Sequence, residues 1–282
     1  MPLVLVPTPL GNLGDVTQRA LATLRAAELV VAEDTRVART LLHALHIGAK
    51  ELWSYREQNA AAVTNGIIER ARESLVAVVS DAGMPGISDP GTELVAAARA
   101  AGVAVEVLPG PSAALGVAVL SGFPLRRFCF EGFPPRTGSA RRSAFERAFA
   151  HDATTIWYES PKRIRESLAA LAALAPDARV FLVREYTKRF EQQVLGSPTQ
   201  VAEALEEPIR GEIAFAVAPY RLEPETSAPE DLDTRIDALL KEGRSAKEIA
   251  RALAAAGAGD RRALYARASA RRSMGDEGAS EQ

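Results

Sequence analysis

Residues 76–91 read VAVVSDAGMPGISDPG, and this stretch decides the fold. The run from Leu75 to Val79 is continuously apolar, which is typical of a strand buried on both faces of a parallel sheet. A loop with three Gly, two Pro and two Asp follows, and Thr92 is a suitable N-cap for a helix over residues 93–101. Open α/β sheets bind ligands at the carboxyl ends of their strands. The stretch therefore predicts a ligand-binding loop or, alternatively, an ordinary strand-to-helix connection.

Two further loops rich in Gly and Pro follow predicted strands of the same sheet, at residues 7–14 and 109–112. Together the three loops would present main-chain N–H and C=O groups to a polar small molecule, which favours a ligand site over three unrelated turns. Strands and helical patterns alternate, so we expect an α/β domain with a largely parallel sheet over residues 1–122. Its expected strands cover residues 3–6, 29–32, 51–55, 75–79 and 103–108.

A second α/β domain is expected over residues 123–220, with a sheet that mixes parallel and antiparallel strands. Residues 221–229 are rich in Pro and charge and are interpreted as a linker. A small helical domain should follow at 230–272, where Ser245 and Glu248 form a capping-box pattern, and then a disordered tail at 273–282. The strands of the second domain are expected at residues 128–131, 154–158, 180–183, 191–195 and 213–217.

Composition excludes several classes of protein. The 282 residues carry a net charge of −2, so the chain as a whole is not a polybasic nucleic-acid binder. A single cysteine, Cys129, excludes a disulfide framework, and the three His have no ligand cluster beside them, so we expect no metal site. No Gly-x-Gly-x-x-Gly or Walker A pattern supports a Rossmann dinucleotide site or a P-loop.

The location of the protein follows from its apolar segments. No run approaches the length of a membrane span. The chain enters its first strand at Leu3 without the basic segment of a signal peptide. We therefore expect a cytoplasmic protein with no membrane partner.

Charged residues suggest two further features. Glu33, Asp34 and Arg36 directly follow the strand at 29–32, and they are either site groups at the ligand edge or an ordinary acidic helix start. Residues 241–272 hold nine Lys or Arg against three Asp or Glu, a bias that indicates phosphate contact or a solvated helix face. Arginine forks match phosphate geometry, and the candidate RNA contacts are Arg136, Arg141, Arg142, Arg261 and Arg262.

Eight stretches, spread from the N-terminus to about residue 217, resemble the tetrapyrrole methylase superfamily of S-adenosylmethionine-dependent methyltransferases. Any one of them alone is a weak signal, but several in this order are specific. They are VPTPLGNL at 6–13, AEDTR at 32–36, SDAG at 80–83, PGPSA at 109–113, RFCFEGF at 127–133, YES at 158–160, REYTK at 184–188 and GE at 211–212.

The resemblance implies a two-domain fold of the class III methyltransferases, with S-adenosylmethionine in the cleft between the domains and usually a homodimer. Met84 stands where the family usually has Thr, Ser88 where it has Asn, and residues 56–59 lack its frequent His. By resemblance, the cofactor contacts are Pro9, Leu10, Ala82, Gly83, Met84, Ile87, Ser112, Ala113, Tyr158, Glu159 and Thr187.

The resemblance is strongest to members of the superfamily that act on ribosomal RNA. It implies 2′-O-methylation of the ribose of a decoding-centre cytidine in the 16S rRNA of the small subunit. A carboxylate would take the hydroxyl proton, with Glu33, Asp34 and Asp81 as candidates. Two other functions stay open at this point: C-methylation of a tetrapyrrole, and a nucleic-acid-binding regulator with the α/β part as sensor.

Overall fold

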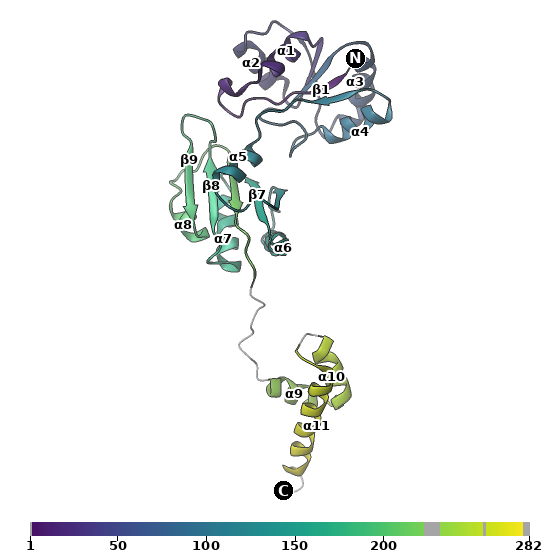
Figure 1. Cartoon of the computed structure of the whole chain (residues 1–282), viewed down its shortest axis with the longest axis vertical. Coiled ribbons are helices and arrows are strands. Elements are labelled where there is room, and N and C mark those ends of the chain that lie inside the picture. Colours follow the sequence, from purple (N-terminus) through teal and green to yellow (C-terminus); the bar gives the residue numbers. More distant parts are fainter. Residues whose placement is uncertain (1, 223–231, 256–257, 279–282) are drawn as a thin grey trace. The chain divides into compact units, whose positions relative to one another are not determined.

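The computed structural model describes residues 2–222, 232–255 and 258–278. The chain forms two compact units, Met1–Leu222 and Glu223–Gln282 (Figure 1). The first unit holds two five-stranded sheets. Within the described residues no helix is both long and apolar enough to cross a membrane.

The first sheet is parallel throughout and has the strand order β3-β2-β4-β1-β5. Its central strand β4 is buried along its whole length, as the unbroken apolar run of residues 76–79 predicted. The sheet places the ends of β4 and β1 side by side, so the loops that follow them meet. The strands are β1 (Leu3–Leu5), β2 (Leu29–Ala32), β3 (Glu51–Ser54), β4 (Val76–Val79) and β5 (Val105–Val107).

Helices cover both faces of this sheet. Alternate residues of each strand enter two separate cores: Leu3 and Val76 pack with α3 and α4, whereas Val4 and Ala77 pack with α1 and α2. This two-layer covering explains why the central strands are apolar on both faces. The helices are α1 (Gln18–Ala26), α2 (Thr35–Ala44), α3 (Ala60–Glu73) and α4 (Thr92–Ala100), and a 3₁₀ turn, η1, covers Leu13–Asp15.

The second sheet is mixed, with the order β6-β7-β10-β8-β9. Strands β6 and β7 are parallel, and the other neighbours are antiparallel. As a result the start of β10 lies between the ends of β7 and β8. The strands are β6 (Phe128–Gly132), β7 (Thr154–Glu159), β8 (Val180–Arg184), β9 (Gln192–Gly196) and β10 (Ile213–Val217).

One face of the second sheet is covered by α5 (Ala113–Leu120), which lies before the domain boundary expected at residue 122. Ala114, Val117 and Ala118 of α5 pack against β7, β8 and β10 because these small side chains let the helix approach closely. The opposite face is covered by α6 (Gly138–Phe149), α7 (Ile164–Leu174) and α8 (Pro198–Glu203).

The second unit packs α9 (Leu232–Lys241), α10 (Ala246–Ala255) and α11 (Arg261–Gly278) around Ile236, Ile249 and Leu264. The predicted capping box is confirmed, because the Ser245 N–H donates to Glu248 Oε2 at 2.9 Å and the Glu248 N–H donates to Ser245 Oγ at 3.4 Å. The expected linker at 221–229 lies outside the described residues from 223 onward.

Two details differ from the sequence-based expectations. Helix α4 begins at Thr92 itself and Gly91 is its N-cap, because glycine accepts the φ of +152° that this turn requires. Helix α11 continues past residue 273, where we expected the disordered tail to begin, as far as Gly278, because each further residue adds an intrahelical hydrogen bond. The last part of that tail, 279–282, lies outside the described residues.

Candidate active site

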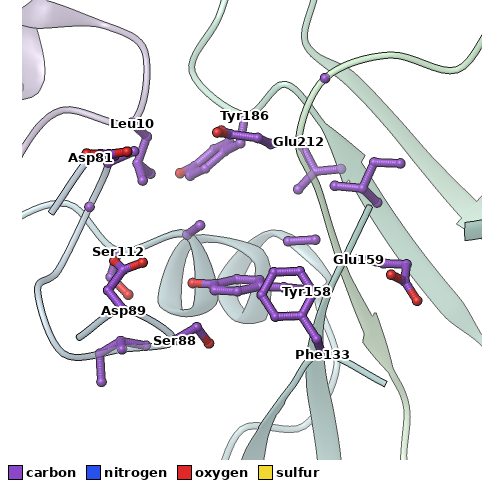
Figure 2. A pocket seen from close by; sticks show the side chains of 18 of the residues that line it. Leu10, Asp81, Ser88, Asp89, Ser112, Phe133, Tyr158, Glu159, Tyr186 and Glu212 are labelled. Atoms are coloured by element: carbon purple, nitrogen blue, oxygen red, sulfur yellow. The ribbon is translucent and has the colours of Figure 1, made fainter. Parts of the chain in front are cut away.

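A cavity of about 420 Å³ is lined by loops of the first sheet and by the facing edge of the second (Figure 2). The first wall comes from the loops after β1 and β4 and from the start of α5. It consists of Leu10, Asp81, Ala82, Gly83, Met84, Ile87, Ser88, Asp89, Ser112 and Ala113. The second wall comes from the segment after β6, the ends of β7 and β8 with the residues that follow them, and the start of β10. It consists of Phe133, Tyr158, Glu159, Ser160, Pro161, Val183, Tyr186, Gly211, Glu212, Ile213 and Ala214.

The β4 loop is tied to the β1 loop by main-chain hydrogen bonds. The Thr8 N–H donates to the Gly83 carbonyl at 2.9 Å, and the Gly83 N–H donates to the Thr8 carbonyl at 3.0 Å. Ser80 Oγ also donates to the Gly83 carbonyl, at 3.0 Å. Gly83 has a φ of +82°, and a Cβ there would stand 3.0 Å from Leu10 Cδ2. A glycine is therefore required where these two loops form the cavity wall.

Two carboxylates, Asp81 and Asp89, stand on the first wall, and Glu33 and Glu212 lie close enough to act on Asp89. Burial, and then the neighbouring carboxylates of Glu33, Asp81 and Glu212, raise the pKa of Asp89 to about 6. Burial and the charge of Asp81 likewise raise the pKa of Glu33, although Arg56 opposes them. Asp89 thus lines the cavity with a carboxyl group that changes charge close to neutral pH.

The second wall is built from aromatic rings and from polar groups that have partners within the protein. Tyr158 Oη accepts a hydrogen bond from the Ala114 N–H at 3.1 Å, in the first turn of α5, and its ring meets those of Phe130 and Phe133 edge-on. The Glu159 carboxylate is fully buried and bonds Ser160 N, Ser167 Oγ and Arg163 Nη2 at 2.8, 2.6 and 2.5 Å. In Figure 2 this carboxylate points away from Asp81 and Asp89.

The loop after β8 joins the two walls. Glu185 and Thr187 both have positive φ, at 55° and 66°, so the turn between them is strained. Lys188 Nζ binds Glu185 Oε1 at 2.9 Å and Glu212 Oε2 at 3.0 Å, and its side chain packs so closely on Gly11 that a Cβ there would stand 2.2 Å from Lys188 Cγ. These contacts fix Tyr186 at the cavity.

A family model described as Tetrapyrrole (Corrin/Porphyrin) Methylases matches residues 2–202. The chain belongs to the tetrapyrrole methylase family. Members of this family use S-adenosylmethionine as methyl donor. Both the family and the fold class predicted from the sequence are confirmed.

Relatives of this tetrapyrrole methylase carry a more specific name. A protein named ribosomal RNA small subunit methyltransferase I, from Streptococcus pyogenes serotype M1, is 40% identical over 89% of this chain and 90% of its own. Its namesake from Mesorhizobium japonicum is 39% identical over 94% of this chain and 90% of its own. Among solved structures, a diphthine synthase matches with a TM-score of 0.61 at 16% identity, over 77% of this chain and 90% of that one. At such identity the likeness shows the fold alone.

Most of the cofactor contacts predicted for this tetrapyrrole methylase line the cavity. Pro9 does not line the cavity and is buried. Thr187 does not line it either, and its N–H donates to Glu191 Oε2 at 2.7 Å. Thr187 Oγ1 is buried without a hydrogen-bond partner among the described residues. The predicted contacts that line the cavity are Leu10, Ala82, Gly83, Met84, Ile87, Ser112, Ala113, Tyr158 and Glu159.

Sequence reasoning missed several lining residues. Ser88 and Asp89 stand in the very loop that was singled out, and Phe133, Tyr186 and Glu212 stand in stretches that carried the resemblance. The signal was therefore present as motifs, but nothing in a motif says which of its side chains faces the cavity. Val183, Ile213 and Ala214 had no local signal, because they meet only through the strand order of the second sheet.

The three candidate proton acceptors differ in position. Asp81 lines the cavity, and its Oδ1 accepts from the Asp34 N–H at 3.2 Å. Asp34 does not line the cavity, because it caps α2 and bonds Arg36, whose guanidinium holds the pKa of that carboxyl well below its usual range. Glu33 is also absent from the lining, although its charge acts on Asp89.

The candidate RNA-binding arginines also differ. Arg141 is 3% exposed and donates to the carbonyls of Pro135 and Arg136 and to Glu166 Oε2, the last at 2.9 Å. This burial contradicts its assignment to RNA, because the guanidinium is occupied in holding the loop. The predicted arginines that are exposed are Arg136, Arg142, Arg261 and Arg262, and Arg142 pairs with Glu146 Oε1 at 2.8 Å.

Proposed function

We propose that this tetrapyrrole methylase transfers a methyl group from S-adenosylmethionine to a ribose 2′-oxygen of ribosomal RNA, at a decoding-centre cytidine of 16S rRNA in the small ribosomal subunit. One observation carries the proposal: proteins named ribosomal RNA small subunit methyltransferase I match this chain at about 40% identity over about nine-tenths of both chains. The fold-level matches, at 16–22% identity, do not choose a substrate.

The cavity fits the cofactor in size and chemistry. Its volume of about 420 Å³ lies within the range of small-molecule sites. Leu10, Gly83 and Ala113 give a wall of small side chains and main chain, and the carboxylates of Asp81, Asp89 and Glu212 suit a cation. When bound, S-adenosylmethionine supplies a methyl group on a positively charged sulfonium, so the leaving group is already activated.

The chain itself has to hold the ribose hydroxyl in line and take its proton. The O–H bond breaks as the new O–C bond forms, and the proton passes to a carboxylate. We assign this role to Asp89, because it lines the cavity and has a pKa of about 6, close to the value that suits a general base at neutral pH. Asp81 remains the second candidate.

Exposed arginines outside the cavity would hold the RNA backbone. The chain carries a net charge of −2, so attraction to phosphate has to come from local groups. Arg136 lies on the loop before α6, and Arg261 and Arg262 lie in the first turn of α11. Replacing Arg261 and Arg262 together by Ala should weaken binding to small subunits and flatten its salt dependence, with S-adenosylmethionine affinity unchanged.

The proposal includes a homodimer. Leu115 and Val119 stand four residues apart on α5, so they share a helix face, and they are 55% and 70% exposed. An apolar face of this kind is stabilised by burial against a second copy. Sedimentation equilibrium of the wild type and of a Val119→Asp variant measures this, and a monomeric wild type would exclude it.

The experiment that tests the function is methyl transfer from labelled S-adenosylmethionine to small subunits that lack the modification. Nuclease digestion should release labelled 2′-O-methylcytidine. Uroporphyrinogen serves as the alternative acceptor in a parallel reaction. Transfer to uroporphyrinogen but not to the particles would replace this proposal by tetrapyrrole C-methylation.

A further inference from the structure

A second cavity, of about 450 Å³, lies next to the first, and Phe133 lines both. It is formed by the loop after β6, by the last turns of α6 and by β7. Its apolar part includes Pro135, Ala144 and Trp157, and its polar groups are Glu131, Arg147 and His151. The function proposed above makes no use of this cavity.

Two arginine side chains hold the loop after β6, which forms one side of the second cavity. The buried Arg141 donates to the carbonyls of Pro135 and Arg136, and Arg163 Nη1 donates to the carbonyl of Pro134 at 3.3 Å. Two arginines therefore fix the main chain on both sides of Pro135. The cavity is pre-formed, as binding sites usually are, and Phe133 projects from a rigid support.

The side chains suit a group that is flat and apolar at one end and anionic at the other. Phe133 is 53% exposed, so its ring is available for stacking. Arg147 is exposed and has no ion-pair partner among the described residues, and Glu131 Oε1 lies 3.9 Å from His151 Nε2. Nucleotides combine a flat base with a phosphate in this way, and base–aromatic stacking is a common means of holding single-stranded RNA.

We propose that the second cavity holds the nucleotide of RNA next to the one whose ribose enters the first cavity, with its base against Phe133 and its phosphate at Arg147. This inference rests on the function proposed above and adds to it a second subsite. Phe133 then separates two neighbouring nucleotides, which keeps the target ribose out of the RNA stack. A nucleotide must leave its stack before an enzyme can act on it in a closed cavity.

The test fills the second cavity with a bulky side chain and leaves the first cavity unchanged. Ala150 lines the second cavity and is exposed, so Ala150→Trp places an indole in the space proposed for the nucleotide. Ala140 is exposed on α6, the helix whose C-cap is Ala150, and lines neither cavity, so Ala140→Trp is the matched control. We expect Ala150→Trp to raise the KM for small subunits at least about tenfold. The Kd for S-adenosylmethionine and the Tm should stay at wild-type values, and Ala140→Trp should change none of these.

A second variant removes only the phosphate contact. Arg147→Gln should raise the KM for small subunits several-fold, and it should reduce the slope of log KM against log salt by about 0.7 to 0.9, the value for one phosphate. Arg99→Gln, on α4, makes the same change of net charge away from both cavities and should leave the slope unchanged.

The outcomes separate the two proposals. If the wild type does not methylate small subunits, the proposed function fails and this subsite fails with it. If the wild type does so and Ala150→Trp is as active as Ala140→Trp, the function stands and the subsite is wrong. Should Ala150→Trp lose stability or S-adenosylmethionine affinity, Arg147→Gln decides, and an unchanged salt slope overturns the proposal.

Discussion

The two walls of the first cavity use their polar groups in opposite ways. On the first wall, Asp89 faces the cavity and its charge is opposed by other carboxylates. On the second wall, Glu159 bonds three groups of the protein, and Tyr158 Oη accepts the Ala114 N–H. Asp89 is only partly buried, whereas the Glu159 carboxylate is fully buried. A second difference lies in whether each polar group already has a partner within the protein.

This comparison assigns different roles to the walls. Unpartnered groups keep their full capacity for a ligand, whereas partnered groups stabilise the fold and shape the cavity. Substitutions of the unpartnered polar groups on the first wall should therefore lower activity or binding and leave stability intact or improved. Substitutions of partnered groups on the second wall should lower stability.

The largest effect is expected at Asp89. Asp89→Asn should lower kcat for methyl transfer by about 10²- to 10⁴-fold, the usual contribution of a general base, with the Kd for S-adenosylmethionine changed much less. In the wild type, kcat/KM should fall as the pH drops below about 6, because the protonated carboxyl accepts no proton. Asp177→Asn, at an exposed position, is the control. If Asp81→Asn abolishes transfer and Asp89→Asn does not, the base is Asp81.

Asp89→Asn should also stabilise the protein. The pKa of Asp89 is raised from 3.8 to about 6 on folding, so the folded state binds the proton more tightly, and the charged form opposes folding above pH 6. Because the group is only partly buried, we expect Asp89→Asn to gain about 1 kcal/mol at pH 7.5, a rise in Tm of about 2–4 °C. The gain should shrink as the pH falls from about 6 towards 3.8, because the unfolded state then becomes protonated as well. A lower Tm at pH 7.5 would contradict the role of the first wall.

Gly83 should show the next largest effect, on cofactor binding. Gly83→Val places a branched side chain at a φ of +82° against Leu10, so the β1 and β4 loops have to separate. We expect S-adenosylmethionine affinity, measured by calorimetry, to fall at least about 100-fold, a cost of about 3 kcal/mol. Gly102→Val is the matched control, because Gly102 has a φ of +72° and open space around its Cα. Equal affinity in the two variants would remove the loop from the site.

These contrasts show what could be predicted from the sequence. Apolar runs predicted the start of every strand of both sheets to within two residues, because buried strands exclude polar side chains. The loops of the first wall were predicted because strand ends of a parallel sheet share one edge. The contact of Tyr158 with Ala114 and that of Arg141 with Glu166 were not predictable, because these partners lie far apart in the chain. The partners of Glu159 lie within eight residues of it, but no motif says that these side chains turn toward its carboxylate.

Glu159→Gln tests whether the partnered groups of the second wall stabilise the fold. Its carboxylate is fully buried and paired with Arg163, so Glu159→Gln leaves that guanidinium without its counter-ion and should cost about 2–3 kcal/mol of unfolding free energy. Urea unfolding measures the change. Glu146→Gln, which breaks the exposed pair with Arg142, should cost less than about 0.5 kcal/mol. If Glu159→Gln is as stable as the wild type but fails to bind S-adenosylmethionine, Glu159 belongs with the first wall.

The smallest effect is expected at Tyr158, where one hydroxyl links the second sheet to the first turn of α5. The N-cap residue Ser112 makes no side-chain bond to that turn, so Tyr158 Oη does the capping instead. Tyr158→Phe keeps the ring and its contacts with Phe130 and Phe133 but leaves the Ala114 N–H unpaired. It should lower the free energy of unfolding by about 1 kcal/mol.

Tyr55 offers the opposite case, because its buried hydroxyl has no partner among the described residues. Tyr55→Phe should therefore be neutral or stabilising. If urea unfolding gives equal losses for the two variants, partnership does not govern these hydroxyls and the distinction between the walls fails.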